Sequence, residues 1–457
     1  MNIMKLSRKI FISSALITVF LNSSANAVNL HEALVSTYAT NEDLKSKRIE
    51  FIDSLEQFSQ ALAGFLPDIS ARLELNDLKN KRISQKDTTS APTKSKSLQR
   101  NLTVRQNIFN GGSSMANLKA AQEGYKAAKS KFYDEEQKIL YAAVTAYLNY
   151  DEAKSIYDIS DASVNFYAKS LESVDAKFKI GEATKTDLAI SESQLSKAKF
   201  ERSQNYSNLE SNRAKFRQTI GTNPEAIEKI ALPQLPDDIE KFSAKATQNN
   251  WALNSAKYSL SAAKAGVNAA AGNLLPTLTA QVAASRTYYD PEGPANGLNG
   301  LNYTTSLVLN IPIFSNGGAE YSRIRHARNE SRKAALSIDQ TIKTVQTNVV
   351  YLWEAFQSLQ SGVRSADLAV QAQETALKGA TYEFNVGLKT IVDVLNVEKT
   401  LTDLKINQVQ INKQRLLQAY QIKLMIGEFT AKSLALNVKY FNPEAEFKKI
   451  KMKIIGF

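Results

Sequence analysis

Two copies of one pattern constrain the fold of this chain more than any other feature. Residues 178–188 read FKIGEATKTDL and residues 384–394 read FNVGLKTIVDV, so Gly181 matches Gly387 at an offset of 206 positions (387 − 181). Further matches at this or a similar offset are Ile220-Gly221 with Ile426-Gly427, FLPDISA from residue 65 with LLPTLTA from residue 274, and Ile108-Phe109 with Ile313-Phe314. Agreement over so much of the chain predicts an internal duplication.

Within each copy, helical and strand patterns follow one another in the same order. We expect helices at 30–63, 113–179 and 184–220 with a hairpin at 66–109, and then helices at 245–273, 318–385 and 390–426 with a hairpin that ends at 314. The longest helices carry apolar residues at heptad spacing, as in Leu118, Tyr125, Phe132 and Ile139. A heptad sustained over this length predicts coiled-coil packing, and the many alanines in the seam allow close approach.

The predicted helix lengths imply a long wall of paired helices. At ~1.5 Å per residue the longest helices span roughly 100 Å and the shorter ones roughly 50 Å. Two short helices placed end to end therefore match one long helix. The chain would rise to a hairpin, run the full length down, turn at Gly181 or Gly387, and climb halfway back.

The hairpins alternate apolar and polar residues. Ile69, Ala71, Leu73 and Leu75 alternate with polar side chains, and Leu307, Leu309, Ile311 and Ile313 alternate with Ser306 and Asn310. Strands of roughly ten residues with one apolar face suit a membrane barrel, although a soluble sheet packed on its own core is the alternative. Four strands cannot close a barrel and open edges are not tolerated in lipid, so several subunits must each supply four. The first hairpin loop is basic, and it would either meet lipid phosphates or simply be solvated.

The first residues predict export. Lys5, Arg8 and Lys9 precede an apolar run at 10–21, and small residues follow at 25–27, so residues 1–27 read as a secretory signal peptide. No later stretch has roughly 18 uninterrupted apolar residues, and we expect no transmembrane helix. Cysteine is absent, which excludes disulfides and thiolate metal sites. The net charge of +12 hints at an anionic partner, but no nucleic-acid motif accompanies it.

Few residues are suited to chemistry. The two histidines, His31 and His326, lie in helical stretches without a metal-ligand partner at i+4. The sequence has no P-loop, nucleophile elbow, dinucleotide-binding glycine motif or tight acidic cluster. We therefore expect no metal, no cofactor and no enzymatic activity, unless scattered carboxylates meet in space.

The turns between the long helices are the most informative positions. Gly181 and Gly387 suit the left-handed residue that ends a helix. Asp187 and Asp393 each lie three residues after a threonine, the spacing of a capping box, and this role needs no further function. The alternative comes from symmetry, because a ring of Asp393 side chains around a tube would repel and would need opposite charges to keep it closed. Lys389 is the nearest candidate cation.

The duplicated order of LP, two strands, GG and a long helix, together with VGLKTIVDVLN at 386–396, resembles the TolC family of bacterial outer-membrane efflux proteins. The resemblance covers essentially the whole chain after residue 27. It implies a homotrimer in which a twelve-stranded β-barrel in outer-membrane lipid continues into a long α-helical barrel in the periplasm, circled by a small mixed equatorial domain. It also implies a passive duct for efflux or type I secretion, joined through a periplasmic adaptor to an inner-membrane ABC or proton-driven transporter.

The resemblance assigns roles to residues at the turns. It implies that Asp393 belongs to a constricting ring, that Lys389 replaces a basic residue that links neighbouring turns, and that Asp187 marks the partner region in the first copy. Asn396 stands where the best-known member has a second ring aspartate and Phe384 where it has a linking tyrosine, so ring charge and closed-state hydrogen bonding should be weaker. The residues expected to dock an adaptor are Ile180, Gly181, Glu182, Val386, Gly387 and Leu388.

The fold class is therefore mainly α with a membrane β-barrel part. After the signal peptide we expect first-repeat short helices (28–64), a first barrel hairpin (65–112), a long helix with tip turn and return helix (113–221), an equatorial linker (222–244), second-repeat short helices (245–273), a second hairpin (274–317), a second long helix with turn and return (318–427), and an equatorial and C-terminal tail (428–457). The end of that tail, FKKIKMKIIGF, would be a belt strand, a barrel-assembly signal or, as we favour, a frayed tail.

Two other classes of protein fit parts of this pattern. A periplasmic coiled-coil adaptor or binding protein without a pore would also show a heptad and a duplication. An envelope enzyme on a coiled-coil scaffold is the second alternative, and the shortage of catalytic groups argues against it. The four alternating strands favour a channel, and the VGLKTIVDVLN motif decides.

Overall fold

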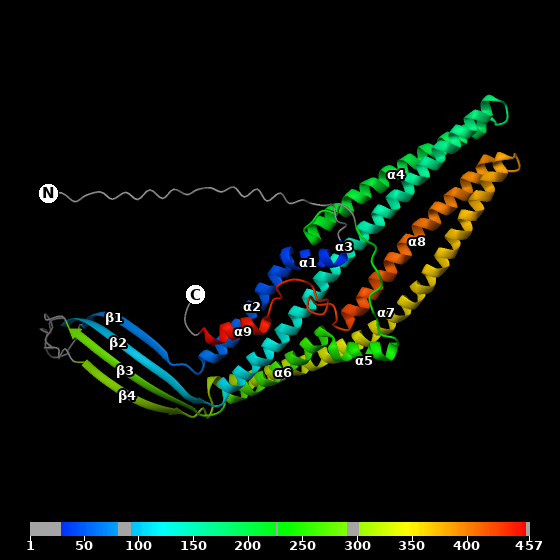
Figure 1. The fold of residues 1–457 in the computed structure, drawn as a ribbon. Coiled ribbons are helices and arrows are strands. Elements are labelled where there is room, and N and C mark those ends of the chain that lie inside the picture. The colour runs from blue at the N-terminus through cyan, green and yellow to red at the C-terminus, as the bar shows by residue number, and fades with distance from the viewer. Residues whose placement is uncertain (1–28, 81–92, 225–226, 290–300, 454–457) are drawn as a thin grey trace, which may run out of the picture.

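The computed structural model describes residues 29–80, 93–224, 227–289 and 301–453. The chain is elongated, with a sheet at one end and long helices that reach the other end (Figure 1). The predicted signal peptide, the centres of both hairpin loops and the last four residues lie outside the described part.

Both halves of the chain follow the same order of elements. The first half has α1 (Leu30–Thr40), α2 (Glu42–Ala63), β1 (Asp68–Asn80), β2 (Thr93–Asn110), α3 (Ser113–Lys179) and α4 (Lys185–Ile220). The second has α5 (Ile239–Asn249), α6 (Trp251–Gly272), β3 (Thr277–Tyr289), β4 (Leu301–Asn310), the 3₁₀ turn η1 (Asn316–Gly318), α7 (Ala319–Asn385) and α8 (Ile391–Met425), and α9 (Pro443–Met452) follows. The two predicted long helices are confirmed, because α3 and α7 contain 67 residues each.

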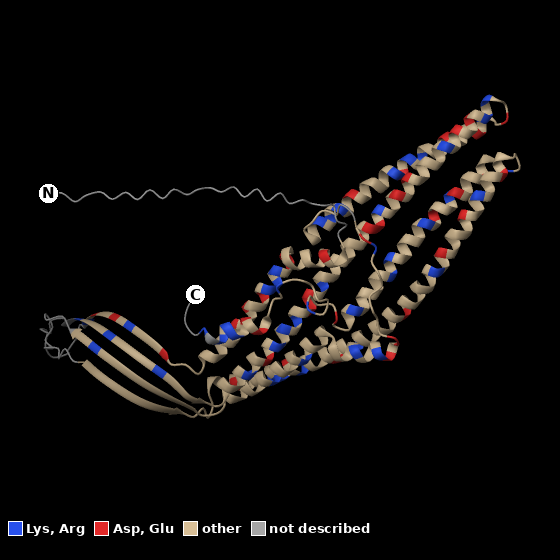
Figure 2. Ribbon diagram, viewed as in Figure 1, with Lys and Arg blue, Asp and Glu red and all other residues tan. Residues whose placement is uncertain are grey.

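The strands form one antiparallel sheet in the order β1-β2-β3-β4. Its central pairing, β2 with β3, joins the two halves, and the register shifts at a bulge between Asn107 and Phe109. Large apolar side chains on the sheet are exposed, Leu73 to 75% and Leu307 to 65%, which does not fit a sheet packed on its own core. β4 has no charged residue and β3 has only Arg286, whereas charges are spread along β1, β2 and the helices (Figure 2).

The helices pack as two successive layers. Next to the sheet, α2 packs on α3, α3 on α6 and α6 on α7; further away, α4 packs on α3, α3 on α8 and α8 on α7. The long helices α3 and α7 therefore run through both layers, and each is paired with one short helix after another, as the lengths predict. Within the described residues, no helix is long and apolar enough to cross a bilayer.

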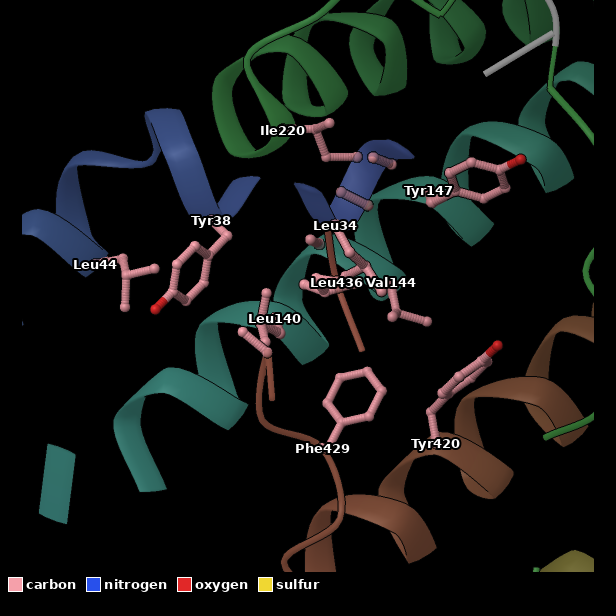
Figure 3. Packing of buried hydrophobic residues seen from close by; sticks show 14 of the residues in the cluster. Leu34, Tyr38, Leu44, Leu140, Val144, Tyr147, Ile220, Tyr420, Phe429 and Leu436 are labelled. Atoms are coloured by element: carbon pink, nitrogen blue, oxygen red, sulfur yellow. The ribbon is translucent and has the colours of Figure 1, made fainter. Parts of the chain in front are cut away.

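The largest core lies where these layers meet. The cluster includes residues from four segments: Leu34 and Tyr38 of α1, Leu140 and Tyr147 of α3, Ile220 at the end of α4, and Phe429 and Leu436 of the segment after α8 (Figure 3). That segment is fixed to α3 by hydrogen bonds: the Phe429 amide donates to Gln137 Oε1 at 3.1 Å and the Ala431 amide to Glu136 Oε1 at 2.8 Å. Burial raises the pKa of Glu136 to about 7.

Some helix boundaries differ from the expectation. The helix expected at 30–63 is two helices, because Asn41 ends α1 and caps α2, and its side chain accepts from the Leu44 amide at 3.1 Å. Asn250 divides α5 from α6 in the same way, and α5 begins at 239 rather than 245.

The favoured interpretation of the C-terminal segment as a frayed tail is wrong for its described residues. Asn442 caps α9 and Pro443 occupies its first turn, so the local sequence starts a helix. Phe447 of α9 stacks on Tyr125 at 4.1 Å between ring centroids and meets Phe58 of α2 edge-on. These aromatic contacts fix α9 against α2 and α3.

Candidate gating site at the helical tip

The two turns at the far end of the molecule are built alike. Gly181 and Gly387 have φ of 83° and 81°, the left-handed region, as expected. The amides of Glu182 and Leu388 each donate at 2.8 Å to the carbonyl five residues earlier, which satisfies the last carbonyls of α3 and α7. A Cβ at either glycine would meet no atom within 4 Å, so the backbone angle and not space requires glycine.

Both predicted capping boxes are present. Asp393 Oδ2 accepts from the Thr390 amide at 3.0 Å and from its hydroxyl at 2.7 Å, and the Asp393 amide donates to Thr390 Oγ1 at 3.3 Å. Thr184 and Asp187 form the same box at the start of α4. The hydrogen bonds from Thr390, with Lys389 nearby, lower the pKa of Asp393, so this exposed carboxylate is charged at neutral pH.

Asn396 is exposed one turn further along α8, on the same side as Asp393. The side chain of Lys389 lies within its own turn. Its Nζ is 2.9 Å from an oxygen of Glu383, near the end of α7, and this hydrogen bond raises the pKa of Lys389. A link from Lys389 to a neighbouring chain stays a prediction.

A contact that the sequence analysis missed joins the two turns. Lys177 Nζ donates to the carbonyl oxygen of Phe384 at 3.1 Å and lies 4.1 Å from the centroid of its ring. The first-copy helix α3 is thereby fixed to the second-copy helix α7 through Phe384. Aligning the two copies could have drawn attention to Lys177. At the offset of 206 positions Lys177 corresponds to Glu383, so the two copies carry opposite charges at this position.

An apolar cluster beneath the turns holds the two helix pairs together. Tyr167 and Val174 of α3 are buried with Val394 and Leu395 of α8. Glu398, one turn further along α8, is only 7% exposed, and its nearest hydrogen-bond partner is the Thr402 hydroxyl at 3.5 Å. Burial raises its pKa to about 7, against a smaller opposing effect of Lys405.

Both turns expose apolar side chains beside charged ones. Ile180, Val386 and Leu388 are exposed to 69%, 51% and 77%, and Gly181, Glu182 and Gly387 lie between them. Exposed apolar residues clustered at one end of a molecule are typical of a protein contact. In the described part of the chain, no three His, Asp or Glu side chains are placed to hold one metal ion.

Comparison with known proteins places these features in a wider group. A family model described as "Outer membrane efflux protein" matches residues 33–222 and 243–428. The chain is 25% identical over 440 residues to the outer membrane efflux protein BepC of Brucella suis biovar 1 (strain 1330), covering 96% of this chain and 94% of the relative. It is 22% identical over 434 residues to the outer membrane protein TolC of Escherichia coli (strain K12), covering 91% and 86%.

The fold is also that of a solved channel. The crystal structure of the Campylobacter jejuni CmeC outer membrane channel superposes with a TM-score of 0.78 at 14% identity, covering 93% of this chain and 90% of that one. At this identity the likeness concerns the fold alone.

Proposed function

Because the chain belongs to the outer membrane efflux protein family, we propose that it is the passive exit duct of a tripartite efflux or type I secretion system, gated at its periplasmic helical tip. The chain is an outer-membrane efflux channel protein by membership of that family. The gate, the assembly and the partners are the parts that we propose.

The observation that carries the proposal is the exposed sheet with two free edges. β1 and β4 are each paired on one side only, and apolar residues on the strands are exposed. A strand edge cannot stay open in lipid, because its unpaired amides and carbonyls would lack partners. A homotrimer removes every edge by pairing β4 of one protomer with β1 of the next, and it yields a twelve-stranded barrel that contacts outer-membrane lipid.

We assign the gate to the tip turns. Asp393 repeats around the three-fold axis as an acidic ring, with Asn396 as a second, uncharged ring. Lys389 and Asp187 belong to the links between neighbouring turns, and Phe384 is held by Lys177. Because one of the two ring positions is neutral, block by cations should be weak.

The tip also supplies the docking surface for a periplasmic adaptor. The exposed apolar side chains of Ile180, Val386 and Leu388 support this assignment, and the adaptor would couple the duct to an inner-membrane ABC or proton-driven transporter.

Conductance in planar lipid bilayers tests the function. Detergent-extracted protein should form channels, and Asp393→Ala should raise their conductance or weaken cation block. Asp403→Ala is the matched control, since it removes an exposed carboxylate from the same helix, α8, away from the turn. A protein that is extracted without detergent and gives no conductance would be a periplasmic adaptor instead, and unchanged conductance and block in Asp393→Ala would refute the ring.

A further inference from the structure

One groove of the first half is filled by the chain itself. Helix α9 packs on α2, and its Phe447 stacks on Tyr125 of α3 and meets Phe58 of α2 edge-on. Glu444 of α9 pairs with Lys129 of α3 at 2.7 Å. The groove between α2 and α3 is therefore aromatic, and α9 covers it.

The duplication predicts a corresponding groove between α6 and α7. The LP motifs of the two copies are 209 positions apart (274 − 65), so Phe58 corresponds to Val267, and at the offset of 206 Tyr125 corresponds to Ser331. Val267 and Ser331 line a cavity of about 410 Å³ between α6 and α7. No segment of the described chain fills this cavity, and the α9 of another copy would find no aromatic side chain in its lining.

The lining of this cavity is basic. Lys264 of α6 and Arg328 and Arg332 of α7 contribute three positive charges. Asn268 and Ser331 add neutral hydrogen-bond donors, and no lining residue is acidic. The three cationic side chains are exposed, and none of them has an ion-pair or hydrogen-bond partner among the described residues. Such a lining suits a phosphate group, whose oxygens accept two parallel hydrogen bonds from a guanidinium.

The nearby carboxylates do not neutralise these charges. Helix α6 contains no Asp or Glu. In the first four turns of α7, an oxygen of Glu320 lies 2.6 Å from Arg323 Nη1, and an oxygen of Glu330 lies 3.9 Å from Lys333 Nζ. The acidic groups of this region are therefore paired with other cations, and the cavity keeps an unbalanced positive charge.

The cavity lies close to the end of the sheet. Apolar exposure continues beyond β4 through Ile313 (91%) and Phe314 (73%), just before α7 begins. Tyr321, exposed to 49%, is spaced at i, i+7 and i+11 with Arg328 and Arg332, so the three share one face of α7. Counted from the start of α7 at ~1.5 Å per residue, Tyr321 lies roughly 3 Å, Arg328 roughly 14 Å and Arg332 roughly 20 Å from the sheet.

This order of residues suits the border of a lipid layer. Aromatic side chains are enriched at such a border, and basic side chains bind the phosphate headgroups beside it. Helical side chains tilt toward the helix N-terminus, which in α7 is the end nearest the sheet, so both guanidinium groups reach toward that border. The anion is thus expected at the level of the headgroups.

We propose that the cavity between α6 and α7 binds the headgroup of an anionic phospholipid from the periplasmic leaflet of the outer membrane. Lys264, Arg328 and Arg332 surround its phosphate, and Asn268 and Ser331 donate further hydrogen bonds. The lipid takes in the second half of the chain the place that α9 holds in the first. The inference goes beyond the exit duct and rests on one part of that proposal, namely that the sheet lies in lipid.

Native mass spectrometry of the full chain tests the site, with phosphatidylglycerol or phosphatidylcholine added to the detergent micelles. The natural chain should retain phosphatidylglycerol in about tenfold larger fraction than phosphatidylcholine, because the cations of the cavity repel the choline ammonium. The variant with Arg328→Gln and Arg332→Gln should retain about tenfold less phosphatidylglycerol, because it loses two charge-assisted contacts.

The matched control carries Lys333→Gln and Lys343→Gln, which remove the same charge from α7. Lys333 lies on another side of the helix, and Lys343 lies roughly 16 Å farther from the sheet than Arg332. All four substituted positions are exposed, so both double variants should fold. The control should retain phosphatidylglycerol as the natural chain does.

The outcomes distinguish a lipid from a soluble anion and the site from the duct. Equal retention by the two double variants, or of the two lipids by the natural chain, would overturn the site, and displacement of the lipid by equimolar inorganic phosphate would overturn the lipid as its occupant. Conductance of the same preparations in planar bilayers tests the duct separately. A chain that conducts without selecting phosphatidylglycerol loses only the site, and one that selects it without conducting loses only the duct.

Discussion

Removing the ammonium group of Lys177 should weaken the closed tip. Lys177→Met keeps an unbranched apolar side chain but loses the donor to the Phe384 carbonyl and the cation above its ring. The substitution leaves Gly181, Gly387 and both capping boxes in place, so a change in opening can be attributed to the lost contacts of Lys177.

The size of the effect follows from these two contacts. A hydrogen bond from a charged donor contributes about 1.5–3 kcal/mol and an exposed cation–π contact about 0.5–1 kcal/mol. Lys177 is half-buried, so solvent screening reduces the sum to about 1 kcal/mol per protomer. That is about fivefold in the opening equilibrium, and if three protomers open together the change is roughly a hundredfold.

The assay is single-channel recording in planar bilayers, with the fraction of time spent in the open state as the readout. Lys179→Met is the control, since Lys179 is more exposed and pairs with Asp175 one turn earlier in the same helix. An open fraction that is equal in the two variants, with the trimer intact in both, would refute the idea that Lys177 holds the turns together.

Three further changes test other parts of the structure. Lys389→Glu places a second carboxylate beside Glu383, so closed-state conductance should rise, and an unaltered value argues against a role in closure. Burial raises the pKa of Glu398 to about 7, so the folded chain binds a proton there that the unfolded chain releases above about pH 4.5, and the free energy of unfolding falls as the pH rises toward and through 7. Glu398→Gln should therefore raise the thermal midpoint at pH 8 and leave it unchanged near pH 4. An equal difference at both pH values would contradict the titration. Phe429→Ala empties a fully buried site and should lower the free energy of unfolding by about 3–5 kcal/mol, while Phe200→Ala, 62% exposed, should change it by less than about 0.5 kcal/mol; equal losses in denaturant titrations would show that Phe429 is not a core residue.

Most of the helical framework could be predicted because its signals are local and repeated. The bounds of α3 follow from an uninterrupted heptad between the paired glycines at 111–112 and Gly181, and the capping boxes from threonine and aspartate at fixed spacing. The breaks at Asn41 and Asn250 escaped prediction because a single asparagine in an apolar periodic run is a weak cap signal. Asn442-Pro443 is a helix-start signal, which the interpretation of the residues after it as a frayed tail overlooked.

The contact between Lys177 and Phe384 could not be predicted from either turn alone. The two residues are 207 positions apart, and one of the groups is a backbone carbonyl, which carries no sequence signal.

The joining of the two chain ends has a consequence for biogenesis. The amide of Phe441 donates to the Tyr38 hydroxyl at 2.9 Å across 403 positions, and the core around α1 is completed by residues that follow α8. Contacts between such distant residues form late and slowly. The middle of the molecule therefore cannot close on a partly translocated chain, and the exposed strands must be kept from aggregating until the last residues have left the translocation machinery.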